Sequence, residues 1–407
     1  MNFSKSEKFF IFFSWLICFC IGTEYAITRP ASNGIFLTTF SAQFIPWVWL
    51  ATVPFNLLIV YLYNRLLPKV GPLKMLISMA SAAMGVSLLC ALLLPLFPQL
   101  VFFHFIWKDI YILFMFKQLW SLIHVTIAPN RSKYLYGIIF GMGMLGSIVG
   151  SAISGFFAKS MGSENLFFLT LPIYALLILS YRKAMTYSPI ATVSFEKEIQ
   201  EPKEGISLIL RNRLLFSILM LVVFMQISVG LAEYQFNTYV ELNIFEKDLR
   251  TEYCGRIFGL TSLVSLALQF IGSFLLVHLI GVKRSHLLIP LILLANGIAA
   301  VLIPSFALIT FSFVLVKMFD FSLFGVVKEM LYIPLKLDEK FRAKAIIDVF
   351  AYRSSKALVS LAILGLQIFA TATILKVVSF VSVLFFAAWL FFVYFFLRPE
   401  EQKQVVI

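Results

Sequence analysis

Long apolar stretches separated by short polar segments occupy almost the whole chain of 407 residues. A helix needs about 20 mainly apolar residues to cross a bilayer, and about a dozen stretches reach this length. We expect spans at 9–27, 44–63, 74–97, 100–126, 135–159, 164–184, 214–237, 255–280, 285–304, 306–326, 347–374 and 377–397. The pattern therefore predicts an all-α polytopic membrane protein with about 12 transmembrane helices.

The longest polar segment, 185–213, lies between the sixth and seventh expected spans. We expect an N-terminal six-helix half at 1–184, a cytoplasmic linker at 185–213 and a C-terminal six-helix half at 214–407. Two six-helix halves are typical of major-facilitator transporters, in which the substrate binds near the midplane and access alternates between the two sides.

The composition supports a membrane protein: 61% of the residues are hydrophobic and only 13% are charged. These values exclude an ordinary soluble enzyme and a disordered chain. The net charge of +13 is explained by the positive-inside rule, because Lys and Arg gather in alternate loops. This bias predicts cytoplasmic N- and C-termini, and no nucleic-acid partner is needed to explain it. We expect the location to be a bacterial inner membrane.

The fifth expected span carries small residues at intervals of four. They are Gly143, Ser147, Ser151 and Gly155 on one stripe, and Gly146, Gly150 and Ser154 on another. Small residues at this spacing allow helix backbones to approach closely in a membrane. We therefore expect a packing role for this span.

Ionisable residues inside expected spans are costly at membrane depth and commonly mark a functional cavity. Gln226, Glu233 and their neighbours Gly230 and Asn237 form one polar stripe on the seventh span. We assign this stripe to the wall of a cavity. In the tenth span, Lys317 and Asp320 are three residues apart, a spacing that favours a pair within one helix.

Three basic residues lie around the ends of the tenth and eleventh spans: Lys328, Arg353 and Lys356. Arginine offers a planar fork of donors and lysine a point charge, and both suit a phosphate or carboxylate group. The alternative is that these residues only anchor helix ends at the cytoplasmic side. Arg353 lies well inside its span, so we favour an anionic small-molecule substrate.

Residues 328–335 read Lys-Glu-Met-Leu-Tyr-Ile-Pro-Leu, and Lys-Ala-Ile-Ile-Asp-Val follows at 344–349, before Arg353 and Lys356. This block over 322–356 resembles the signature of the ATP/ADP translocase (nucleotide transporter) family of plastids and obligate intracellular bacteria. Weaker similarities occur in the same order near Arg29, Trp120 and Glu233. The resemblance implies a twelve-helix carrier that exchanges nucleotides, with Lys328, Arg353, Lys356 and Glu233 at the substrate.

The chain departs from the family at several charged positions. Pro30 and the three residues after it replace a segment that contains a lysine in the family, Gln118 replaces an acid, and the lysine near Asn237 is missing. Arg29 and Lys117 supply the positive charge that remains in the first half. Because each lost contact to an anion weakens its binding, these departures point to a less highly charged nucleotide or a smaller anion.

Three functions stay open. The first is nucleotide exchange, with ATP or ADP as cargo. The second is transport of another small anionic metabolite or cofactor, with proton coupling through Glu24 or Glu233. The third is a membrane receptor or assembly factor that transports nothing. We expect no enzymatic activity, because the sequence has no phosphate-binding Gly-Lys-Ser/Thr loop, nucleophile–base arrangement or metal-ligand cluster. We also expect no cofactor, and one chain could form the complete transporter as a monomer.

Overall fold

The computed structural model of the chain describes residues 4–127, 129–188, 208–332, 347, 351–369 and 373–396. Across these residues the secondary structure is helical, with no strands. Within the same part of the chain, nine helices are long and apolar enough to cross a membrane, and Ser354–Phe369 is a shorter apolar helix. The predicted all-α, multi-pass membrane architecture is confirmed.

The chain divides into two compact units. The first contains residues 1–44, 51–197 and 244–263, and the second contains 45–50, 198–243 and 264–407. Residues 45–50 of the predicted N-terminal half are thus grouped with the second unit, and residues 244–263 of the predicted C-terminal half with the first. The six-helix halves at 1–184 and 214–407 stay a prediction.

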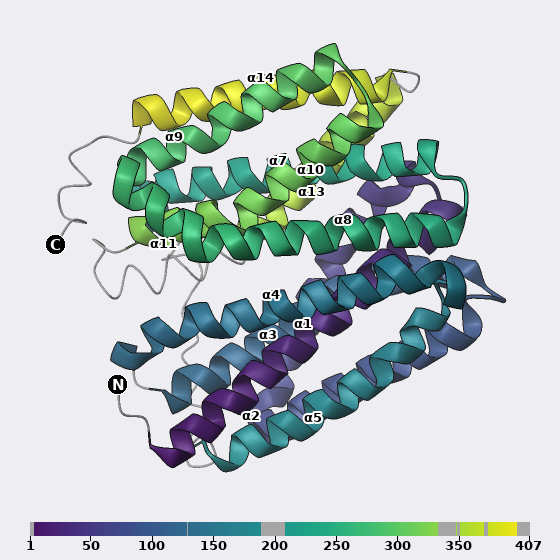
Figure 1. Cartoon of the computed structure of the whole chain (residues 1–407), viewed down its shortest axis with the longest axis vertical. Helices are drawn as coiled ribbons and strands as arrows, with labels where there is room; N and C mark the ends of the chain where they lie inside the picture. The colour runs from purple at the N-terminus through teal and green to yellow at the C-terminus, as the bar shows by residue number, and fades with distance from the viewer. Residues whose placement is uncertain are drawn as a thin grey trace. The chain divides into compact units, whose positions relative to one another are not determined.

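In the first unit, α1 (Lys5–Thr39) packs against α3 (Val101–Thr126), α4 (Pro129–Met161) and α5 (Thr170–Thr186). These helices run side by side in Figure 1. α1 begins with a capping box, in which Ser4 and Glu7 satisfy each other's backbone N–H groups, as is typical of a well-defined helix start. Most of α1 beyond Ile17 is buried, so this helix forms the core of the unit.

The small residues of α4 pack against two different helices. A Cβ atom on Gly146 or Gly150 would collide with the backbone carbonyl oxygen of Phe19 or Thr23 in α1. Gly155 lies against Gly255 of α8 (Lys247–Ala267), where a Cβ on Gly255 would lie 2.6 Å from the Gly155 nitrogen. The predicted close packing of this span is confirmed.

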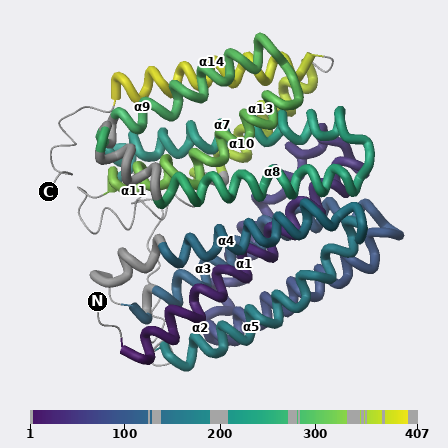
Figure 2. The backbone as a smooth tube through the Cα atoms, in the orientation of Figure 1, coloured from purple at the N-terminus to yellow at the C-terminus, as the bar shows by residue number. Residues whose placement is uncertain are grey.

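In the second unit, α7 (Arg213–Asn243) contacts α10 (Phe306–Phe319), α13 (Tyr352–Phe369) and α14 (Ile374–Phe396). α14 also runs along α9 (Ser273–Leu302), as the tube in Figure 2 shows. α10 continues through a π-helical turn, Asp320–Phe324, into α11 (Gly325–Leu331). These elements form one continuous helical segment, which we call the α10–α11 rod. Lys317, Asp320 and Lys328 lie along it.

Two pairs of expected spans join through a single glycine each. α2 (Ile45–Leu93) covers the second and third expected spans and breaks at Gly71, with φ 76°. α9 breaks in the same way at Gly281, with φ 79°, between the eighth and ninth expected spans. Glycine adopts this left-handed region without steric cost. The same device occurs at corresponding positions in the two predicted halves, as internal repeats of transporters would give.

Candidate functional site

Polar contacts join α7 to the α10–α11 rod inside the second unit. We call the four residues that make them the ladder: Gln226, Glu233, Lys317 and Asp320. The Nε2 atom of Gln226 donates to Oδ1 of Asp320 at 3.0 Å. About two turns further along α7, Oε2 of Glu233 lies 3.3 Å from Nζ of Lys317. Glu233 and Lys317 are both buried. The predicted polar stripe of α7 therefore faces protein partners and not lipid.

The local structure explains how these four side chains meet. Gln226, Gly230 and Glu233 follow one face of α7, where residues three and four apart are neighbours. Gly230 leaves room for α13, since a Cβ there would lie 3.0 Å from Cγ1 of Val359. Asp320 begins the π-helical turn, a feature often found at functional sites because it alters the register of one helix face.

The expected pairing of Lys317 with Asp320 takes a different form in the structure. Lys317 reaches across to Glu233, and Asp320 accepts from Gln226. The charges of Lys317 and Lys328 both act on the Asp320 carboxyl group. The helical spacing of Lys317 and Asp320 places them on one face of the rod, and each has a partner on the facing helix α7.

Within the ladder, carboxyl groups outnumber cationic groups, and the cation Lys328 lies further along the same rod. Lys317 carries one positive charge, whereas Glu233 and Asp320 carry two carboxyl groups. Lys328 lies on α11 with its Nζ 3.7 Å from Oε1 of Glu329, and its side chain is 16% exposed against 46% for Glu329. Lys328 is thus a half-buried cation whose neighbouring acid is open to solvent, so an anion can compete for it.

α13 contributes the other two predicted basic residues. Nζ of Lys356 lies 5.0 Å from the centre of the Trp49 ring, a cation–π contact within the second unit. Trp49 is buried, and its indole N–H has no acceptor among the described residues. Arg353 lies in the first turn of α13, but its side chain is outside the described residues.

The two predicted residues of the first unit rest on aromatic rings. The guanidinium of Arg29 lies 4.2 Å from the centre of the Phe258 ring. Lys117 lies 4.6 Å from the Tyr63 ring and 3.4 Å from Oδ1 of Asn64. The structure therefore brings together Gln226 and Glu233 with Lys317, Asp320 and Lys328, while Arg29 and Lys117 have separate surroundings.

Sequence reasoning did not include Lys317, Asp320 and Trp49 among the site residues. Lys317 and Asp320 carried a usable signal, because both are ionisable residues in an apolar span. Trp49 carried none, since nothing in its sequence neighbourhood links it to Lys356. In the part of the chain that the structure describes, no group of His, Cys, Asp or Glu side chains could hold a metal ion.

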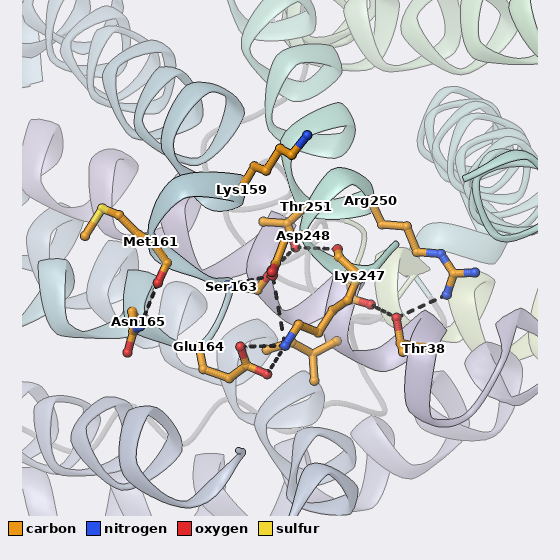
Figure 3. A network of polar contacts seen from close by, with 12 residues as sticks. Thr38, Lys159, Met161, Ser163, Glu164, Asn165, Lys247, Asp248, Arg250 and Thr251 are labelled. Carbon is orange, nitrogen blue, oxygen red and sulfur yellow. Dashed lines mark hydrogen bonds and ion pairs between the residues drawn. The ribbon is translucent and has the colours of Figure 1, made fainter. Parts of the chain in front are cut away.

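A second polar network surrounds the turn between α4 and α5 in the first unit (Figure 3). Asp248 accepts from the backbone N–H of Ser163 at 2.8 Å and from its hydroxyl at 2.5 Å. Lys247 pairs with Glu164 at 2.6 Å, and Arg250 donates to Thr38 at the end of α1 at 3.2 Å. These contacts satisfy one another and fix the start of α8, so we assign them a structural role.

Comparison with known proteins supports the sequence resemblance in the region of the ladder. Residues 301–398 match the TLC ATP/ADP transporter family. The resemblance predicted from residues 322–356 is thereby confirmed for this part of the chain, which contains Lys317, Lys328 and Lys356. A comparison with curated proteins finds no match.

Solved structures of transporters share the fold over nearly the whole chain. A variant of the nucleoside transporter NupG superposes with a TM-score of 0.70 at 10% identity, covering 96% of this chain and 100% of its own. A bacterial homologue of the human lysosomal transporter Spinster gives 0.63 at 13% identity, covering 99% of each chain. A bacterial homologue of the iron transporter ferroportin gives 0.64 at 11% identity, covering 96% and 100%. At such identities the likeness shows the fold alone, and together with the family match it identifies a membrane transporter.

Proposed function

We propose that this protein is a secondary transporter that exchanges nucleotides of the ATP/ADP type across a membrane by alternating access. The observation that carries the proposal is the coincidence of the family match with the buried charge ladder. Residues 301–398 match the nucleotide-transporter family, and the same segment supplies Lys317, Asp320, Lys328 and Lys356. The nucleotide is cargo in this proposal, and concentration gradients drive its movement.

The ladder suggests how a phosphate group would bind. Glu233 compensates the charge of Lys317 at 3.3 Å. A phosphate that reaches Lys317 competes with Glu233 for the ammonium group, and Lys328 adds a second cation on the same rod. Charge-assisted contacts of this kind are the strong ones in anion recognition. Arg353 would add a bidentate donor from the first turn of α13.

Lys356 offers a further cation to the phosphate groups. Its ammonium group lies 5.0 Å from the centre of the buried Trp49 ring, which holds the lysine in place. Phosphates pair with lysine. Glu233 and Gln226 complete the wall on α7, and Arg29 and Lys117 supply the positive field expected from the first half.

A second substrate class is favoured by the first unit. Arg29 and Lys117 already contact aromatic rings, and the family's lysine after Arg29 is replaced here by the segment from Pro30 to Asn33. A smaller anionic metabolite or cofactor requires fewer cations than a triphosphate. Either cargo is consistent with a carrier that performs no chemistry, inserted in a bacterial inner membrane with both termini cytoplasmic.

Counter-exchange in proteoliposomes tests the proposal. Vesicles containing the purified protein are preloaded with unlabelled ATP, ADP or AMP and then offered the labelled nucleotide, with Lys328→Ala measured in parallel. We expect uptake that requires internal nucleotide and falls to background in the variant. If folded protein exchanges none of these nucleotides, the substrate assignment is wrong, and the same assay with other anions examines the second class.

A further inference from the structure

Glu24 occupies the buried core of the first unit. It lies on α1 and is 2% exposed. Its Oε1 atom accepts from the Tyr174 hydroxyl at 2.7 Å and from the Thr28 hydroxyl at 3.2 Å. Its Oε2 atom is buried and has no hydrogen-bond partner among the described residues. One oxygen of this carboxyl group is therefore satisfied by neutral donors, and the other is unsatisfied.

In the part of the chain that the structure describes, the helices around Glu24 contribute no positive charge to it. Tyr174 belongs to α5. The Tyr111 ring of α3 lies edge-on to the Tyr174 ring, with 5.4 Å between the ring centres. Tyr111 is also close enough to interact electrostatically with the Glu24 carboxyl group. Ser87 of α2 contacts the Tyr174 hydroxyl at 3.4 Å. α4 packs against α1 here through Gly146 and Gly150, which bring no titratable group, and Cys20 is the other titratable neighbour on α1.

The charged residues nearest along the neighbouring elements have their own contacts. Lys108 pairs with Asp109 at 3.1 Å, and Tyr25 donates to the same carboxylate at 3.2 Å. Arg29 lies over Phe258, and His104 shares a hydrogen bond of 2.8 Å with Ser32. Within the described residues, no ion pair includes Glu24. A charged carboxylate in such surroundings is expensive, whereas a carboxylic acid needs no counter-charge.

We propose that Glu24 is a proton-binding site of the transport cycle. An O–H bond forms at Oε2 when the carboxylate takes a proton from water on one side of the membrane, and the same bond breaks when the proton is released on the other side. Tyr174 holds Oε1 and so directs the proton to Oε2. The inference rests on the proposed transport function, and it adds a coupling ion that nucleotide exchange by itself does not require.

Infrared spectroscopy of the purified protein tests the site without any substrate. A protonated carboxyl group has a carbonyl stretch separate from that of a carboxylate. We expect a pH-dependent carboxyl band in the native chain that disappears in Glu24→Gln and persists in Glu246→Gln, which changes an exposed acid at the start of α8. Glutamine has the same shape and still accepts from Tyr174, so the variant should fold. A band that is unchanged in Glu24→Gln would overturn the proposal.

Transport supplies an independent readout. Proteoliposomes preloaded with unlabelled ADP are given labelled ADP with and without an inward proton gradient. We expect the gradient to accelerate exchange by the native chain and by Glu246→Gln but not by Glu24→Gln, while Tyr174→Phe shifts the pH at which exchange is half-maximal. An equal acceleration of exchange in Glu24→Gln would also refute the site.

The two proposals fail in distinguishable ways. If no form of the protein moves ADP, the substrate assignment fails for this nucleotide and the carboxyl band alone decides the status of Glu24. If counter-exchange is normal and the Glu24 band is absent at every pH, nucleotide exchange stands and the proton site is wrong.

Discussion

Lys317 of α10 and Glu233 of α7 form a buried ion pair, with Nζ and Oε2 3.3 Å apart. Their side chains are 8% and 11% exposed. Each charge is costly by itself in such surroundings, so each stabilises the position of the other. The pair links two helices of the second unit at the level of the predicted polar stripe.

Removing one member of this pair should destabilise the protein more than removing both. Lys317→Met leaves Glu233 without its cation, and the loss for a buried pair broken in this way is about 3–5 kcal/mol. The double variant Lys317→Met with Glu233→Gln should recover most of this stability, because both charges of the pair are removed together. Chemical unfolding in detergent measures both.

The same double variant separates packing from function. We expect it to fold and to show background counter-exchange, since Lys317 is proposed to receive the phosphate. A double variant that exchanges nucleotide at the native rate would remove the Lys317–Glu233 pair from the site.

Lys328→Ala should reduce nucleotide binding with little effect on folding. The Lys328 side chain is half-buried beside an exposed acid, and Asp320 keeps its hydrogen bond from Gln226 when Lys328 is removed. One charge-assisted contact is worth about 1.5–3 kcal/mol, and we expect roughly a ten- to hundredfold loss of affinity. Lys376→Ala, an exposed lysine at the start of α14, is the matched control and should bind normally. Equal affinities in the two variants would contradict the assignment.

Gly22→Ala should destabilise the first unit. A Cβ at this position would collide with the carbonyl oxygen of Gly143, where α1 and α4 approach closely. Overpacking of this kind costs about 1–3 kcal/mol. Gly85→Ala in α2 is the control, because nothing lies within 4 Å of a Cβ there, and it should be neutral or stabilising. Thermal unfolding of the two variants side by side checks the difference.

Asp248→Ala should cost more than Glu164→Gln in the network of Figure 3. Asp248 satisfies both the backbone N–H and the hydroxyl of the buried Ser163, and leaving such donors unpaired costs about 1–3 kcal/mol. The Glu164–Lys247 pair includes a lysine that is 32% exposed, and such pairs contribute about 0–1 kcal/mol. In unfolding measurements at low and high salt, the loss from Glu164→Gln should shrink at high salt. Most of the loss from Asp248→Ala should persist, although Lys247 also lies 4.0 Å from Oδ1 of Asp248. The reverse order of the two losses would mean that the ion pair, and not the Asp248 hydrogen bonds, fixes α8.

The fold could be predicted from the sequence because its cause is local. An apolar stretch of about 20 residues is long enough to span a bilayer whatever lies beside it. The stripe of small residues in α4 likewise predicted close packing, and the structure shows it at Gly146, Gly150 and Gly155. The sequence did not predict that single glycines, Gly71 and Gly281, would join neighbouring spans, because hydrophobic periodicity does not reveal where a glycine adopts a positive φ.

The sequence by itself determined which residues are ionisable, which helix face each one occupies, and that residues 322–356 resemble a nucleotide transporter. Only the tertiary structure decided what faces each charge. It pairs Lys317 with Glu233 and Asp320 with Gln226. It also places Trp49 beside Lys356 and neutral hydroxyl groups beside Glu24. The physical reason is that helical periodicity fixes the direction of a side chain, whereas the energy of a buried charge depends on partners from segments that are distant in the sequence.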